Sequence, residues 1–148
     1  MNAPGPDAGL ERACGVFTER WMQAYAQSWN AEQAMVQELM RLRFSAVIGY
    51  GFLDATTPRG MLVVLRGHAA HAGDYDGRDL DWDLRAAPAD WNCWLAQGFS
   101  VPDLLMAVAA DRLQLRIGDY RRILRKPPLI SALLRAFTLM TEVSVVEP

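Results

Sequence analysis

Cysteine and histidine, which supply many catalytic nucleophiles and metal ligands, are scarce in this chain of 148 residues: it has two of each. Cys14 and Cys93 lack the spacing of a metal knuckle or a redox pair, so we interpret them as small buried apolar residues. His68 and His71 are an odd number of positions apart, which predicts opposite faces if they lie on a strand. We therefore expect no catalytic residues, no metal and no cofactor.

The sequence also lacks the common motifs of enzyme active sites. There is no glycine-rich phosphate loop, no nucleophile elbow and no zinc-binding helix motif. The acidic stretch 74–83 fails as a calcium loop, because Gly77 falls at its fourth position and Arg85 at its twelfth. Asp81 and Asp83 are better interpreted as water-facing positions of a strand. These absences favour a protein that is not an enzyme.

Long apolar runs and a strong net charge are absent too. No run reaches the length of a membrane span, and residues 1–9 lack the features of a signal peptide. We expect these residues to be a flexible N-terminus and the protein to be cytoplasmic. The formal net charge of −2 gives no reason to expect nucleic-acid binding. Lys126 is the only lysine among 15 basic residues, which indicates GC-rich coding and a bacterial origin.

Apolar periodicity predicts the elements of the first half. Apolar residues at helical spacing favour one helix from Leu10 to Trp29, and a second that Asn30 caps. Strands are expected over 44–52 and 61–66, paired as a hairpin, with 67–72 as an extension of the second strand. Alternation of apolar and acidic residues predicts another strand over 80–84.

The second half is mainly helical. Pro88 opens a helix that Gly98 ends, and Ser100 with Asp103 forms a capping box for the next helix. A strand over 112–118 and a final helix over 129–140 complete the pattern. This order predicts a single α+β domain over 10–148, with helices stacked on a mostly antiparallel sheet.

From the hairpin onward the chain resembles the sterol carrier protein 2 family. The resemblance lies in the apolar strand 61–65, the strand 80–84 with the helix after it, and the sequence that runs from helix 100–111 through strand 112–117 to Gly118-Asp119 and the last helix. It implies a sheet of about five strands covered by helices. It also implies an internal tunnel for a fatty-acyl, sterol or prenylated quinone-like molecule, carried without chemistry. Some bacterial relatives act as accessories in ubiquinone biosynthesis.

Eight apolar residues are the candidate lining of such a tunnel, although ordinary core packing explains each of them as well. A lining of this kind binds because burying apolar ligand surface contributes roughly 25 cal/mol per Å2. The candidates are Trp91, Trp94, Leu104, Leu105, Val108, Leu133, Phe137 and Met140.

A basic cluster precedes the last helix. Arg121, Arg122, Arg125 and Lys126 are interpreted either as a solvated face or as a contact with anionic lipid headgroups or with a partner protein. The second hypothesis for function is therefore an accessory subunit that docks through this cluster onto an enzyme complex acting on hydrophobic substrates. The oligomeric state and the identity of the ligand stay open.

Overall fold

The computed structural model describes residues 15–98, 100–119, 121–122 and 125–143, so the predicted flexible N-terminus 1–9 and Cys14 lie outside the described residues. Five strands form one sheet in the order β3-β2-β1-β4-β5. β1 and β4 run parallel, and the other three neighbouring pairs run antiparallel. The prediction of an α+β fold with a mostly antiparallel sheet is confirmed. The strands are β1 (Ala46–Phe52), β2 (Gly60–Leu65), β3 (His68–Asp74), β4 (Trp82–Ala86) and β5 (Leu113–Ile117).

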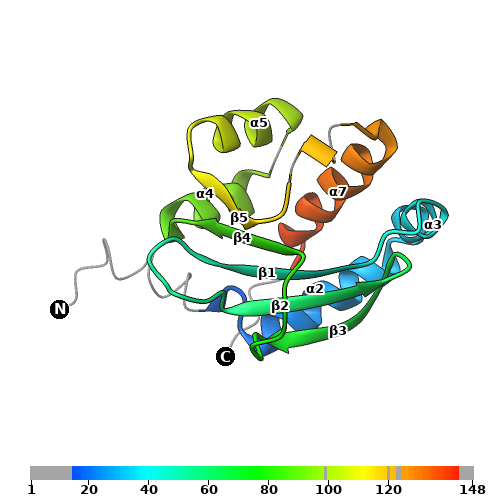
Figure 1. The fold of residues 1–148 in the computed structure, drawn as a ribbon, viewed down its shortest axis with the longest axis horizontal. Helices are drawn as coiled ribbons and strands as arrows, with labels where there is room; N and C mark the ends of the chain where they lie inside the picture. The colour runs from blue at the N-terminus through cyan, green and yellow to red at the C-terminus, as the bar shows by residue number, and fades with distance from the viewer. Residues whose placement is uncertain (1–14, 99, 120, 123–124, 144–148) are drawn as a thin grey trace.

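The longest helices cover one face of this sheet (Figure 1). The side chains of Ile48, Leu62 and Leu84 point to that face and join buried residues of α2 and α7 in the core. The predicted capping box is present, since Ser100 and Asp103 bond each other's backbone N–H at the start of α5. The helices are α2 (Glu19–Ala31), α3 (Gln33–Arg41), α4 (Pro88–Gln97), α5 (Val101–Ala109) and α7 (Pro127–Met140).

The first predicted helix is interrupted at residues 16–18, with its predicted start at 10–14 outside the described residues, and the second helix begins later than the sequence predicts. Phe17 has a φ of 67°, which breaks the helix, and Thr18 then caps α2. Asn30 lies inside α2 and does not cap the next helix. Its side-chain amide bonds both the N–H and the carbonyl of Ala69, at 2.8 and 3.0 Å, so that it fixes α2 against β3.

β3 is a separate strand, where the sequence predicted an extension of β2. Arg66 and Gly67 both have positive φ, at 50° and 83°, and this turn reverses the chain. A bulge between the partners of Val63 and Val64 then shifts the register of β3. His68 pairs with Leu65 and His71 with Val63, so both histidines lie on the same face and not on opposite faces.

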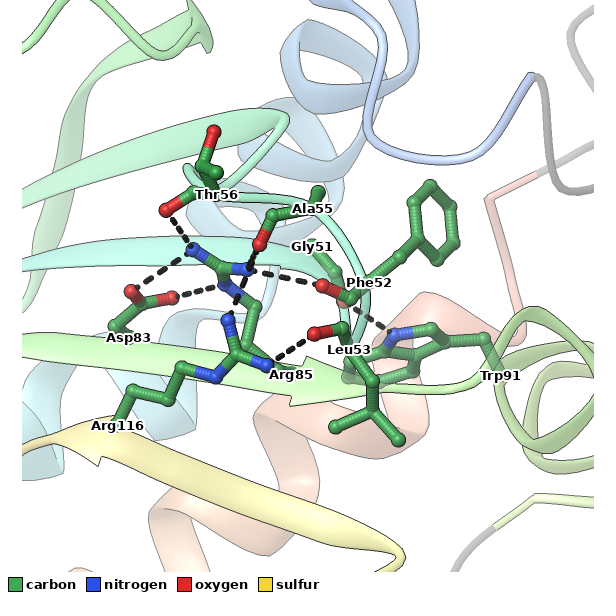
Figure 2. A network of polar contacts seen from close by, with 9 residues as sticks. All are labelled: Gly51, Phe52, Leu53, Ala55, Thr56, Asp83, Arg85, Trp91 and Arg116. Atoms are coloured by element: carbon green, nitrogen blue, oxygen red, sulfur yellow. Dashed lines mark hydrogen bonds and ion pairs between the residues drawn. The ribbon is translucent and has the colours of Figure 1, made fainter.

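A buried ion pair lies on the sheet face opposite the helices (Figure 2). The prediction that Asp83 faces water was wrong, because its exposed fraction is 5% and its carboxylate Oδ1 accepts from Arg85 Nε at 2.6 Å. The segment 53–59 covers this face, and it does so where β1 carries glycine. A Cβ at Gly51 would meet Pro58 Cα at 2.9 Å, so only glycine permits this close approach.

The same segment is fixed through its backbone carbonyls. The Arg85 guanidinium donates to the carbonyls of Phe52 at 2.9 Å and Ala55 at 2.7 Å. Arg116 on β5 donates to the carbonyls of Ala55 and Leu53 (Figure 2). The charged side chains of this network are satisfied within the fold, which indicates a structural role. No helix in the described part of the chain is long and apolar enough to cross a membrane.

Candidate functional site

An apolar cavity of about 300 Å3 lies between the helix-covered face of the sheet and the helices. The volume is at the lower end of the range found for small-molecule pockets in proteins, about 300–1,000 Å3. Three strands form its base, because the alternation of each strand points every second side chain toward the helices. These residues are Ile48 and Tyr50 of β1, Trp82 and Leu84 of β4, and Leu113 and Leu115 of β5.

Helices form the remaining walls. α5 and α7 contribute most of the side chains, and Phe44, just before β1, joins them. Several of these side chains are only half-buried, so the cavity opens to solvent between α5 and α7. The helix residues are Tyr25 and Trp29 of α2, Leu104, Leu105, Val108 and Ala109 of α5, and Ile130, Leu133, Leu134, Ala136, Phe137 and Met140 of α7.

Two polar groups within this lining are paired with backbone carbonyls. The Tyr25 hydroxyl donates to the Ala136 carbonyl at 2.8 Å, and the Trp29 indole N–H donates to the Gly67 carbonyl at 2.8 Å. Burial raises the pKa of the Tyr25 and Tyr50 phenols above the usual value. Both are therefore neutral at physiological pH, and the cavity offers no charge to a ligand.

The structure brings six of the eight predicted lining residues together. Leu104, Leu105 and Val108 line the cavity from α5, and Leu133, Phe137 and Met140 line it from α7. Trp91 and Trp94 are not among the lining residues.

Trp91 and Trp94 belong to the part of the core around α4. Trp91 is fully buried, packs edge-on against Phe17 with ring centroids 4.9 Å apart, and donates its indole N–H to the Gly51 carbonyl at 2.8 Å. Trp94 packs against Trp91 and lies beneath the Arg112 guanidinium. Both side chains therefore attach α4 to the sheet and do not face the cavity.

We expect Trp91→Phe to lower stability without changing ligand binding. The substitution keeps most of the aromatic packing but removes the indole donor to the buried Gly51 carbonyl. Losing such a donor costs about 1–3 kcal/mol in the free energy of unfolding. Urea denaturation measures the stability, and titration with an apolar probe measures the binding. An altered probe affinity in the folded variant would contradict this placement of Trp91.

Sequence reasoning missed the strand side of the lining. The strands predicted over 80–84 and 112–118 contain Trp82, Leu84, Leu113 and Leu115, but their sequence pattern could not distinguish a filled core from a cavity. That difference depends on how far α5 and α7 stand from the sheet, which is a property of packing. Tyr25 and Trp29 were likewise identified as the apolar stripe of a helix.

The basic cluster lies beside the open side of the cavity. Arg121, Arg122, Arg125 and Lys126 are all exposed. A second, polar groove shares Val108, Ala109, Leu113 and Leu115 with the cavity and reaches Arg121. This groove, which we call the β5 groove, also contains Arg116, Asp111 and Asp119.

The described residues contain no group of three or more histidine, cysteine, aspartate or glutamate side chains that could hold a metal ion. Cys93 on α4 is exposed, which corrects the prediction that it is buried.

No family model matches the chain, and the search of curated proteins found no match. Solved structures do match. A crystal structure of sterol carrier protein 2 superimposes with a TM-score of 0.67 and 21% identity, over 87% of this chain and 99% of that chain. The solution structure of a conserved hypothetical protein from Thermus thermophilus, described as a candidate sterol carrier protein, superimposes with a TM-score of 0.64 and 21% identity, over 86% and 89% of the two chains. The chain therefore has the sterol carrier protein 2 fold.

Proposed function

We propose that this protein binds and carries a small apolar molecule, or the apolar tail of a larger one, in the cavity between the sheet and helices α5 and α7. The observation that carries the proposal is the lining itself, which is apolar apart from the hydroxyls of Tyr25 and Tyr50 and the indole N–H groups of Trp29 and Trp82. The names of the proteins that share the fold support the same function.

The volume of the cavity limits the size of the ligand that can be enclosed. An engineered cavity of about 150 Å3 holds one benzene molecule, so a cavity of about 300 Å3 has room for about twelve carbon atoms. Burying one methylene contributes about 0.8 kcal/mol, which gives a chain of this length a gross stabilisation on the order of 10 kcal/mol before the entropy of association is subtracted. A single chain of medium length fits this space, whereas a whole sterol fits only if α5 moves outward.

The apolar lining favours a ligand that is uncharged in the part that lies inside the cavity. An ionised group there would lose its hydration, and no lining side chain supplies an opposite charge. A charged head is therefore expected at the open side, next to the β5 groove. We propose no reaction for the protein, since the Tyr25 hydroxyl and the Trp29 indole N–H are hydrogen bonded to backbone carbonyls and burial keeps the phenols of Tyr25 and Tyr50 neutral at physiological pH.

The test is native mass spectrometry of the purified protein, followed by extraction into organic solvent and titration with n-alkanols of increasing length. We expect a co-purified apolar compound or a one-to-one complex with added alkanol. Affinity should rise about fourfold for each added methylene, up to about twelve carbons, and then level off. A protein that is empty as purified and binds no alkanol, fatty acid, sterol or quinone would overturn the proposal.

A further inference from the structure

α5 presents apolar side chains to solvent at the open side of the cavity. Five large apolar side chains are exposed among the described residues, and three of them lie on α5 or at the end of β5. Met106 has an exposed fraction of 69% and Leu105 one of 46%, while Ile117 has 44%. Among the described side chains of α5, only Ala107 is buried. An apolar surface of this kind usually marks an interaction site.

The basic cluster borders the same surface. Arg121 lines the β5 groove together with Val108 and Ala109 of α5. No acidic residue occurs from position 120 to 141. Within the described ranges, none of Arg121, Arg122, Arg125 and Lys126 forms an ion pair through its side chain.

Three carboxylates lie nearby. Asp103 in the first turn of α5 accepts the Ser100 backbone N–H in the capping box, while Asp111 and Asp119 belong to the β5 groove, where Asp119 accepts the backbone N–H of Arg121 at 2.9 Å. None of the three forms an ion pair with a side chain of the basic cluster in the described structure. The surface formed by α5 and the cluster therefore combines exposed apolar side chains with a positive charge that is not neutralised by pairing.

We propose that α5 and the basic cluster form a docking surface for an anionic lipid bilayer. Met106 and Leu105 would enter the boundary between headgroups and acyl chains, while the basic side chains contact phosphate and carboxylate groups. A bilayer fits better than a protein partner because Leu105 both lines the cavity and is exposed. Docking on this surface therefore places the open side of the cavity against the lipid from which an apolar ligand comes, an inference that rests on the proposed function.

The experiment is flotation with vesicles of phosphatidylcholine alone and of phosphatidylcholine mixed with phosphatidylserine. We expect binding to the mixed vesicles and little to the neutral ones, and we expect high salt to weaken the binding. Met106→Asp should lower the partition coefficient about tenfold, because it removes an inserted apolar side chain and adds a repelled charge. Arg122→Glu combined with Arg125→Glu should have an effect of about the same size or larger.

Matched controls are Met40 and Arg43, which line neither the cavity nor the β5 groove. Met40 on α3 has an exposed fraction of 51%, and Arg43 is an exposed arginine close to it. Met40→Asp and Arg43→Glu should leave vesicle binding unchanged. The proposal is overturned if the wild type does not bind the mixed vesicles, binds neutral vesicles equally well, or loses as much binding through the control variants.

Alkanol binding is measured in parallel without vesicles. Met106 does not line the cavity, so Met106→Asp should keep the wild-type affinity for alkanols. Loss of vesicle binding with retained alkanol affinity supports the docking surface. If the wild type binds alkanols but not the mixed vesicles, only the docking surface is overturned. If the wild type binds no alkanol, the proposed function is overturned.

Discussion

Asp83→Ala should lower the free energy of unfolding by about 3–5 kcal/mol, because it leaves the Arg85 guanidinium buried without its counter-charge. Arg85 has an exposed fraction of 1%, and both carboxylate oxygens of Asp83 accept from it, at 2.6 and 3.2 Å. A water molecule in the vacated space supplies a hydrogen bond to the guanidinium but not the lost negative charge. Urea denaturation followed by tryptophan fluorescence measures the loss.

An exposed ion pair supplies the control. Arg41 and Glu38 pair on the surface of α3, where Glu38→Ala should cost no more than about 0.5 kcal/mol. Replacing both buried partners, as Asp83→Leu with Arg85→Met, should recover part of the loss because no unpaired charge remains. Recovery should be incomplete, since the carbonyls of Phe52 and Ala55 lose their donor. A loss below about 1 kcal/mol in Asp83→Ala would show that the pair is solvated.

This ion pair illustrates what a strand pattern can and cannot predict. The alternation in β4 correctly separated Trp82 and Leu84, which face the helices, from Asp83, which points the other way. It did not reveal that the second face is covered. That cover depends on the close approach of Pro58 to Gly49 and Gly51. A hydrophobic pattern does not identify this approach, because glycine has no side chain.

Local signals predicted the elements best where one residue decides the geometry. The capping box of Ser100 and Asp103 and the end of α4 at Gly98 are of this kind. The break at Phe17 and the turn at Arg66-Gly67 were missed, because positive φ at an aromatic residue or an arginine is imposed by tertiary packing. The parallel pairing of β1 with β4 is also a long-range choice that no local pattern encodes.

The residues of the candidate site, like the helices and strands, could be predicted only in part from the sequence. The helical spacing of α5 and α7 identified six residues that do line the cavity, since amphipathic helices turn their apolar faces inward. Trp91 and Trp94 have the same spacing on α4, but their partners are Phe17 and the Gly51 carbonyl, far away in the sequence. Periodicity therefore identifies a buried face without telling which buried space that face meets.

Leu84→Trp should abolish alkanol binding while the protein stays folded. Leu84 is buried on β4, in the interior of the sheet, and its side chain lines the cavity. A tryptophan on this strand cannot turn out to solvent, so its ring must occupy the ligand space. Overpacking a filled core costs about 1–3 kcal/mol, but here the new ring enters an existing cavity, so we expect the lower end of that range.

A graded series distinguishes occupation of the cavity from damage to the fold. Leu84→Phe adds less volume than Leu84→Trp, so it should shorten the longest alkanol that still gains affinity instead of weakening all alkanols equally. Each methylene displaced from the cavity should lower affinity about fourfold. Leu65→Trp, at an exposed position on β2 outside the lining, is the matched control and should leave the dependence on chain length unchanged. Full alkanol binding by a folded Leu84→Trp variant would place the ligand elsewhere, and a uniform loss across all chain lengths in Leu84→Phe would indicate a disturbed fold.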